Sequence, residues 1–296
     1  MSAAPTPVPR ATGEARVVRA RISARERLRR IIQFRELLVG MVRKELKIKY
    51  KNSVLGFAWS LLNPLLYLVV FWIAFDKILG SPIHAFPIWL LSGLLVWNLF
   101  SIGLSTATTS VVVNAGLVKK VAFPREILPL ASVGSTLVHF FLQGAVLLAV
   151  LVIVQWNVAW TYVPLVPVAL VALLLITAAL GILLAALNVY LRDTQHFVEL
   201  ALLAWFWMTP IVYNFQTVGL KDSFFAKLWA CNPITPVVII FQRAIYGTTE
   251  NGTFLPNWTW GQYAAYLGLS FAFGIVVLAI AIRVFAKAEV NFAEEL

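Results

Sequence analysis

The chain has 296 residues, of which 60% are hydrophobic and 12% are charged, whereas soluble globular domains carry roughly half apolar and a quarter charged residues. This composition excludes an ordinary water-soluble protein. The net charge of +11 is concentrated in residues 1–53, which hold 14 of the 24 Lys and Arg and four of the 13 acids. A basic arm beside membrane spans indicates an anchor at an anionic membrane surface rather than nucleic-acid binding.

Two segments are predicted before the first span. Residues 1–21 are expected to be a disordered basic arm, and the lack of an apolar core before Val54 argues against a cleaved secretory signal. Residues 22–52 are expected to be an amphipathic helix lying at the membrane surface, because their apolar side chains recur with the period of a helix. The apolar face comprises Leu28, Ile31, Ile32, Leu38, Val39, Val42 and Leu46.

The remainder, residues 53–296, is predicted to be one all-α membrane domain with six transmembrane helices. A helix needs about 20 apolar residues to cross the hydrocarbon core. Six segments meet this condition, at 54–75, 86–113, 127–155, 161–190, 196–215 and 262–285.

The distribution of Lys and Arg predicts the orientation of these spans. With the N-terminus in the cytoplasm, 20 basic residues lie on the cytoplasmic side and four lie outside. Basic residues are enriched in cytoplasmic loops. Both termini are therefore expected in the cytoplasm.

The connection between the fifth and sixth spans is predicted to form a re-entrant helical hairpin. It has two apolar stretches, 224–229 and 237–246, each too short to cross a bilayer as a helix. Asn232, Pro233 and Pro236 lie between them, so we expect these residues to form an outer gate.

Several classes of function are disfavoured by missing residues. The phosphate loop G-x-x-x-x-G-K-[ST] does not occur in the sequence, so if ATP drives this protein, another polypeptide hydrolyses it. The predicted spans hold almost no ionisable residues beyond His139 and Glu199, which argues against ion-coupled transport. No catalytic constellation and no Cys/His framework is recognisable, so neither an enzyme nor a bound metal or cofactor is expected.

Residues 43–64 read Arg-Lys-Glu-Leu-Lys-Ile-Lys-Tyr-Lys-Asn-Ser-Val-Leu-Gly-Phe-Ala-Trp-Ser-Leu-Leu-Asn-Pro. This segment resembles the ABC exporter permeases for polysaccharides and polyol phosphates, the family of O-antigen, teichoic acid and cell-wall galactan export. Residues 188–193 and 207–213 look like the same family. The matching residues of the first segment are Glu45, Lys47, Lys49, Tyr50, Leu55, Gly56, Trp59 and Pro64.

The resemblance implies a homodimeric permease in the bacterial cytoplasmic membrane, with two cytosolic ATP-binding subunits that hold ATP and Mg. The cargo would be a lipid-linked polysaccharide or polyol phosphate. Basic residues before the first span and in two loops are expected to dock the ATPase, although topological charges and lipid anchors are an alternative interpretation. The predicted docking residues are Arg43, Glu45, Lys47, Lys49, Tyr50, Lys119, Lys120, Arg125, Arg192 and Asp193.

A glycan conduit is predicted from aromatic and uncharged polar side chains. Aromatic faces offer flat apolar surfaces, and Trp and Tyr add a polar edge, which suits weak contact with a sliding sugar chain. Interface belts and helix packing are the alternative. The predicted conduit residues are Trp59, Asn63, Tyr67, Phe71, Ser101, Ser105, Trp205, Trp207 and Tyr213.

A polar stripe on the third span has a second interpretation. Its residues follow helical spacing, and hydrogen bonding between helices explains them better than a conduit. The stripe comprises Ser132, Ser135, Thr136, His139 and Gln143.

Two other functions remain open on the sequence alone. One is an ABC exporter of small amphiphiles or drugs, and the other is a membrane scaffold without transport activity.

Overall fold

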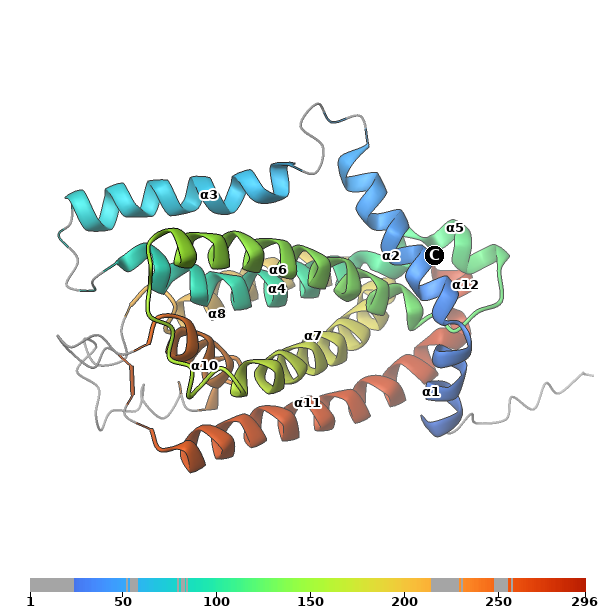
Figure 1. Ribbon diagram of the computed structural model, residues 1–296. Helices are drawn as coiled ribbons and strands as arrows, with labels where there is room; N and C mark the ends of the chain where they lie inside the picture. The colour runs from blue at the N-terminus through green and yellow to red at the C-terminus, as the bar shows by residue number, and fades with distance from the viewer. Residues whose placement is uncertain are drawn as a thin grey trace, which may run out of the picture.

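The computed structural model describes residues 24–51, 53, 58–78, 80, 83, 85–213, 229, 231–247, 255–256 and 258–296. All regular structure in these ranges is helical (Figure 1). The elements are α1 (Ala24–Gln33), α2 (Arg35–Tyr50), α3 (Trp59–Phe71), the π-helix η2 (Trp72–Ile78), α4 (Phe86–Val113), α5 (Ala115–Lys120), α6 (Ile127–Ile153), α7 (Leu165–Tyr190), α8 (Thr194–Trp207), α10 (Thr235–Ile245), α11 (Trp260–Ala288), η3 (Glu289–Asn291) and α12 (Phe292–Glu295). The predicted all-α class is confirmed for the described part of the chain.

Four helices are long and apolar enough to cross a membrane. They are α4, α6, α7 and the helix formed by α11 with η3, and they coincide with four of the six predicted spans. The predicted first span corresponds to α3 and η2, with 13 and 7 residues, and the fifth corresponds to α8, with 14 residues. Each of these is individually shorter than the ~20 residues of a full crossing. Helix α3 runs directly into η2, whereas residues 208–213 after α8 form a turn and bends and are not helical as the predicted span required. Six crossings therefore require α3 with η2, and α8 with these residues, each to cross as one segment.

Small residues allow α7 to pack closely between α4 and α11 (Figure 1). A Cβ atom added at Gly181 of α7 would lie 2.7 Å from the Cβ of Ala107 on α4. A Cβ atom added at Gly274 of α11 would lie 2.9 Å from Leu175 Cγ on α7. Close helix contact through small residues is the usual packing mode in membranes, where apolar burial from water cannot drive association.

The two ends of the bundle differ in character. Helices α1, α2, α5 and α12 gather at one end, here called the basic end, and α10 lies at the other, here called the α10 end (Figure 1). A buried cluster at the basic end joins α2, α4, α6 and α11. Its largest members include Met41, Phe123, Ile127, Phe285 and Phe292.

The predicted amphipathic helix over residues 22–52 is divided into α1 and α2 at Phe34, which adopts a turn. The apolar side of α2 also has a different environment from the lipid surface that was expected. Met41 is buried, and Leu37, Leu38 and Val42 pack beside it against the cluster of the basic end. Part of the apolar surface of α2 that was predicted to face lipid is therefore packed against α6.

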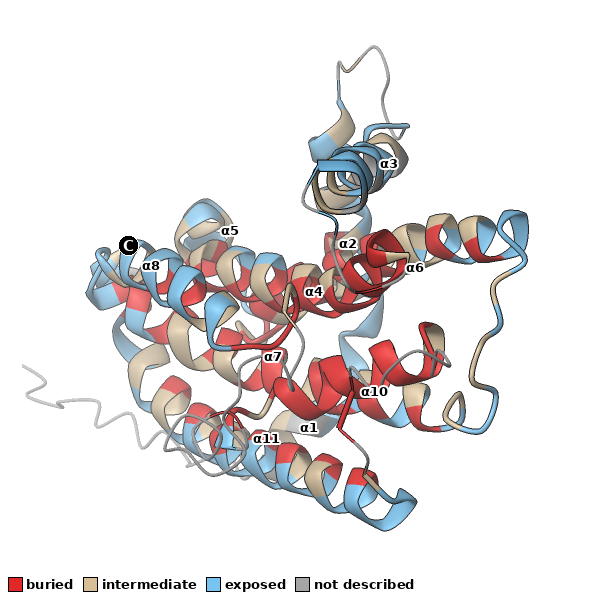
Figure 2. Ribbon diagram, turned by 90° about the vertical axis from the view of Figure 1, so that its left-hand side faces the viewer, coloured by how far each residue is buried: buried red, intermediate tan, exposed pale blue. Residues whose placement is uncertain are grey.

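Helix α10 is packed inside the bundle. Every residue from Thr235 to Ala244 is buried, and the helix contacts α4, α7 and α11 (Figure 2). With 11 residues it is about 16 Å long, so it fills roughly half the depth of a hydrocarbon core. It corresponds to the second helix of the predicted hairpin. Residues 224–228, which make up most of the first, lie outside the described residues, so the hairpin stays a prediction.

Candidate functional site

The first feature of the site is the attachment of α2 to α6 through Glu45. The hydroxyl of Ser132 donates to Glu45 Oε1 at 2.8 Å, and that of Ser135 donates to Oε2 at 2.7 Å. Residues three apart lie on one face of a helix, so both carboxylate oxygens meet the same side of α6. Hydrogen bonds to an ionised group are the stronger kind. The Glu45 carboxylate is thus directed at α6 and not at the solvent beyond the basic end.

The same face of α6 continues to His139, which contacts the end of α2. Lys49 Nζ lies 3.2 Å from His139 Nε2, and the Tyr50 hydroxyl lies 3.3 Å from Nδ1. An ammonium can only donate, so Nε2 accepts and Nδ1 carries the hydrogen. Lys49 is an exposed residue, yet partial desolvation of its ammonium lowers its pKa below the ordinary value, because loss of water disfavours the charged form.

These contacts confirm the hydrogen-bonding interpretation of the polar stripe for Ser132, Ser135 and His139. Their partner is helix α2, which the sequence analysis did not specify. Gln143, one turn further along, is the member that bonds to a span: it accepts from Asn98 of α4 at 3.2 Å.

The other predicted docking residues fall into two groups. Arg125 is half-buried, because its Nη1 donates to the backbone oxygen of Glu289 at 2.8 Å and its guanidinium lies over the ring of Phe292. The second group is exposed, and its docking role stays a prediction. It comprises Arg43, Lys47, Lys119, Lys120, Arg192 and Asp193.

An ion-pair cluster at the basic end was not predicted from the sequence. Arg27 of α1 donates to the carboxylates of Glu126 and Glu289, the latter at 3.2 Å. Glu126 is 3% exposed, and removing Arg27 would leave this buried carboxylate without its ion-pair partner. The two carboxylates lie 99 and 262 residues from Arg27, and no local pattern pairs residues so far apart. The cluster joins α1, the start of α6 and the C-terminal segment.

The predicted conduit residues of α3 form an aromatic row on a helix that is largely exposed (Figure 2). Trp59 and Tyr67 are exposed, and the Tyr67 ring stacks on Phe71 with centroids 6.1 Å apart. Phe71 in turn lies 5.9 Å from Phe75 of η2. The side chain of Asn63 lies outside the described residues.

The conduit residues of the other helices are not all beside this row. Ser101 and Ser105 of α4 are half-buried, and the Ser101 hydroxyl donates to Trp97 within its own helix. Trp207 is exposed, and its backbone oxygen accepts from the Tyr213 hydroxyl at 2.7 Å. Trp205 is half-buried against the core on the α8 side of α4, which separates it from α3.

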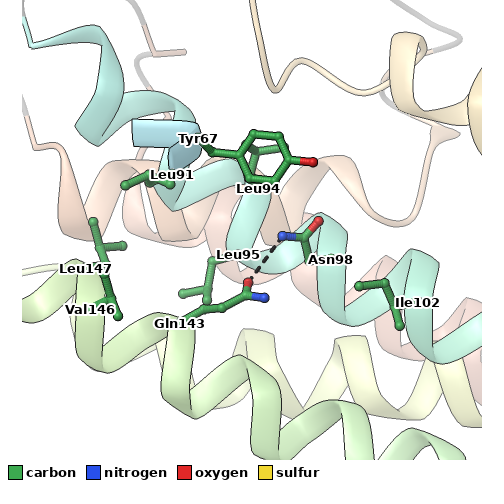
Figure 3. Close-up of a pocket in the computed structure, with 9 residues that line it drawn as sticks. All are labelled: Tyr67, Leu91, Leu94, Leu95, Asn98, Ile102, Gln143, Val146 and Leu147. Atoms are coloured by element: carbon green, nitrogen blue, oxygen red, sulfur yellow. Dashed lines mark hydrogen bonds between the residues drawn. The ribbon is translucent and has the colours of Figure 1, made fainter. Parts of the chain in front are cut away.

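A cavity of about 150 Å³ lies between α3, α4 and α6 (Figure 3). Tyr67 forms one wall, and the hydrogen-bonded amides of Asn98 and Gln143 lie opposite it. Its other walls are aliphatic. Asn98 was missed in the sequence because a single Asn in an apolar span carries no periodic signal.

The predicted outer-gate residues form fixed contacts in the α10 end. Asn232 Oδ1 accepts from Trp205 Nε1 at 2.9 Å, and its amide nitrogen donates to Thr209 Oγ1 at 2.9 Å. The backbone oxygen of Pro233 accepts from Ser270 of α11 at 2.8 Å. Pro236 is buried in the first turn of α10, where a missing N–H has no cost. These bonds join α8, α10 and α11.

We expect the change Trp205→Phe to lower stability in detergent by about 1 kcal/mol, because it removes the indole donor to buried Asn232. The matched control is Trp207→Phe, at an exposed side chain whose indole makes no hydrogen bond in the described ranges. Thermal unfolding of the purified variants measures both. Equal shifts for the two variants would mean that the Asn232 contact does not stabilise the α10 end.

Comparison with known proteins shows the family of this chain. The profile of the ABC-2 type transporter family matches residues 36–246, from the start of α2 to just beyond α10. An O-antigen export system permease protein, RfbA of Myxococcus xanthus, is 34% identical over 74% of this chain and 84% of its own length. Two RfbA proteins of Klebsiella pneumoniae with the same description are 27% and 26% identical over 88% of this chain and 94% of their own lengths. The family resemblance predicted from residues 43–64 is confirmed: the chain is a multi-pass membrane permease and belongs to the ABC-2 type transporter family.

Proposed function

We propose that this permease is the membrane subunit of an ATP-driven exporter that moves a lipid-linked polysaccharide or polyol phosphate across the bacterial cytoplasmic membrane. Family membership and the relatives described as O-antigen export permeases support this cargo class. The functional unit would contain two copies of the chain and two separate ATP-binding subunits. ATP and Mg would be held by those subunits and not by the permease.

The proposal includes six membrane crossings with the basic end in the cytoplasm. Exposed basic side chains on α2, on α5 and at the α7–α8 connection belong to this end. Such residues are retained on the cytoplasmic side of bacterial membrane proteins. In this orientation α10 and the Asn232 contacts face the outside.

The observation that carries the coupling mechanism is the hydrogen bonding of α2 to α6. One side of α2 presents the exposed residues Arg43 and Lys47, while Glu45 is bonded to α6. A push on the exposed side of α2 would therefore displace α6 with it, as a rigid-body movement of packed helices. Because α6 also forms a wall of the cavity beside Tyr67, the movement would reach the predicted conduit.

Deletion of the gene and purification of the protein test this function together. We expect the deletion strain to lose its surface glycan and to keep its resistance to amphiphilic drugs, and we expect an ATP-binding protein to co-purify with the permease in mild detergent. Increased drug sensitivity with unchanged glycan would instead identify an exporter of small amphiphiles. Unchanged glycan together with no ATP-binding partner would contradict the proposal.

A further inference from the structure

We propose that Asn98, Gln143 and Tyr67 form a binding site for a single uncharged sugar unit of the exported glycan. The inference rests on the proposed export of a glycan and adds the chemical group that the permease recognises. It concerns the cavity between α3, α4 and α6 (Figure 3).

Beyond their mutual hydrogen bond, the two amides leave one carbonyl oxygen and three N–H groups without a partner among the described residues. Asn98 Nδ2 donates to Gln143 Oε1 at 3.2 Å. This bond uses one hydrogen of the Asn98 amide and one lone pair of the Gln143 oxygen. The opposite atoms, Asn98 Oδ1 and Gln143 Nε2, form no hydrogen bond with any other described residue. An amide can make several hydrogen bonds, so the pair is only partly satisfied.

The location of the pair makes this incomplete bonding significant. Both residues are in helices long and apolar enough to cross the membrane, and both are half-buried. Lipid tails cannot supply hydrogen bonds to polar groups at that depth. A hydroxyl both donates and accepts. Two neighbouring sugar hydroxyls would therefore satisfy the free carbonyl of Asn98 and the free N–H groups of Gln143.

The shape and charge of the cavity further restrict the chemical class of ligand that it can bind. The exposed ring of Tyr67 lies beside the amide pair in the same cavity, and an aromatic ring offers a flat apolar surface to the C–H face of a sugar. None of the residues lining the cavity is charged, so the site suits a neutral sugar and not a phosphate. Its volume of about 150 Å³ is below the ~300–1,000 Å³ of sites that bury a whole drug-sized molecule. One sugar ring matches this volume better than an intact amphiphile.

Site-specific photo-crosslinking in exporting cells tests the contact directly. A photoreactive amino acid is placed at Val146, which lines the cavity, and at Leu148, an exposed residue of the same helix that does not line it. We expect glycan adducts at Val146 and none at Leu148. Adducts with lipid alone, or equal glycan yields at both positions, would overturn the proposal.

A second experiment uses the double variant Asn98→Leu/Gln143→Leu, which removes both amides and keeps comparable bulk. We expect at least a tenfold fall in surface glycan, with unchanged thermal stability and unchanged recovery of the ATP-binding partner. The control is Thr106→Val on α4, whose hydroxyl bonds only within its own helix. Export within twofold of wild type would refute the site. Unchanged surface glycan after deletion of the gene would refute the proposed function itself. A parallel loss of stability would assign the amides to helix packing and would also refute the site.

Discussion

Replacing Glu45 by lysine is expected to reduce glycan export about tenfold or more, while the permease stays in the membrane and still binds its ATPase. The change removes the acceptor for Ser132 and Ser135 and places an ammonium where a carboxylate was bonded. Bonds to a charged group contribute about 1.5–3 kcal/mol each, so α2 would lose a large part of its attachment to α6. Surface glycan and the amount of co-purified ATPase measure the two effects separately.

Two further variants separate internal coupling from direct docking. Glu36→Lys makes the same charge change at an exposed position in the first turn of α2 and should leave export nearly unchanged. The double change Ser132→Ala/Ser135→Ala should lower export as Glu45→Lys does, because it removes the same bonds from the other side. Loss of ATPase binding in Glu45→Lys, together with normal export in the serine variant, would instead place Glu45 on the docking surface.

The change Gly181→Leu is expected to prevent stable assembly of the bundle. Even the first side-chain carbon would lie 2.7 Å from the Cβ of Ala107, and neither helix backbone can move without disturbing the packing of α7 between α4 and α11. Overpacking in a filled interior costs about 1–3 kcal/mol or more, and leucine adds three further carbons. The yield of monodisperse protein in mild detergent measures the effect.

Two controls identify the cause as close helix approach. Gly268→Leu introduces the same side chain on α11 at a position where no atom outside the local helix backbone lies within 4 Å of the new Cβ, and it should be tolerated. Gly181→Ala should lower the thermal midpoint, because it places two methyl groups in the contact. Adding Ala107→Gly should restore the midpoint, because a single methyl group then remains, as in the wild type. If the exchange fails to restore stability, the contact between these two positions is not what limits the packing.

The membrane-spanning helices were the most predictable part of the fold. The predicted spans 86–113 and 127–155 compare with α4 at 86–113 and α6 at 127–153. A long apolar segment has few alternatives to a helix in lipid, because every backbone polar group must be bonded within the segment. The extents of α3 and α8 were less predictable, since each is bordered by polar or Pro-containing sequence whose path depends on neighbouring helices.

The candidate site was predictable only in its residue types. The sequence correctly singled out the polar stripe of α6 and the motif around Glu45, but it did not join them. Glu45 and Ser132 are 87 residues apart, and their contact depends on how α2 folds back against α6. For the same reason Trp205 was grouped with Trp207, whereas in the structure Trp205 is half-buried and bonded to Asn232, and Trp207 is exposed.

The sequence by itself determined that this chain is an all-helical membrane protein of a recognisable permease family, because apolar length, charge distribution and the motif at residues 43–64 are local properties. Only the tertiary structure decided which polar groups meet. It places α10 inside the bundle, bonds Glu45 to α6 and brings Asn98 to Gln143 beside Tyr67. In a medium without water these contacts are set by which helices lie close enough to satisfy one another's polar atoms, and helix periodicity cannot specify that proximity.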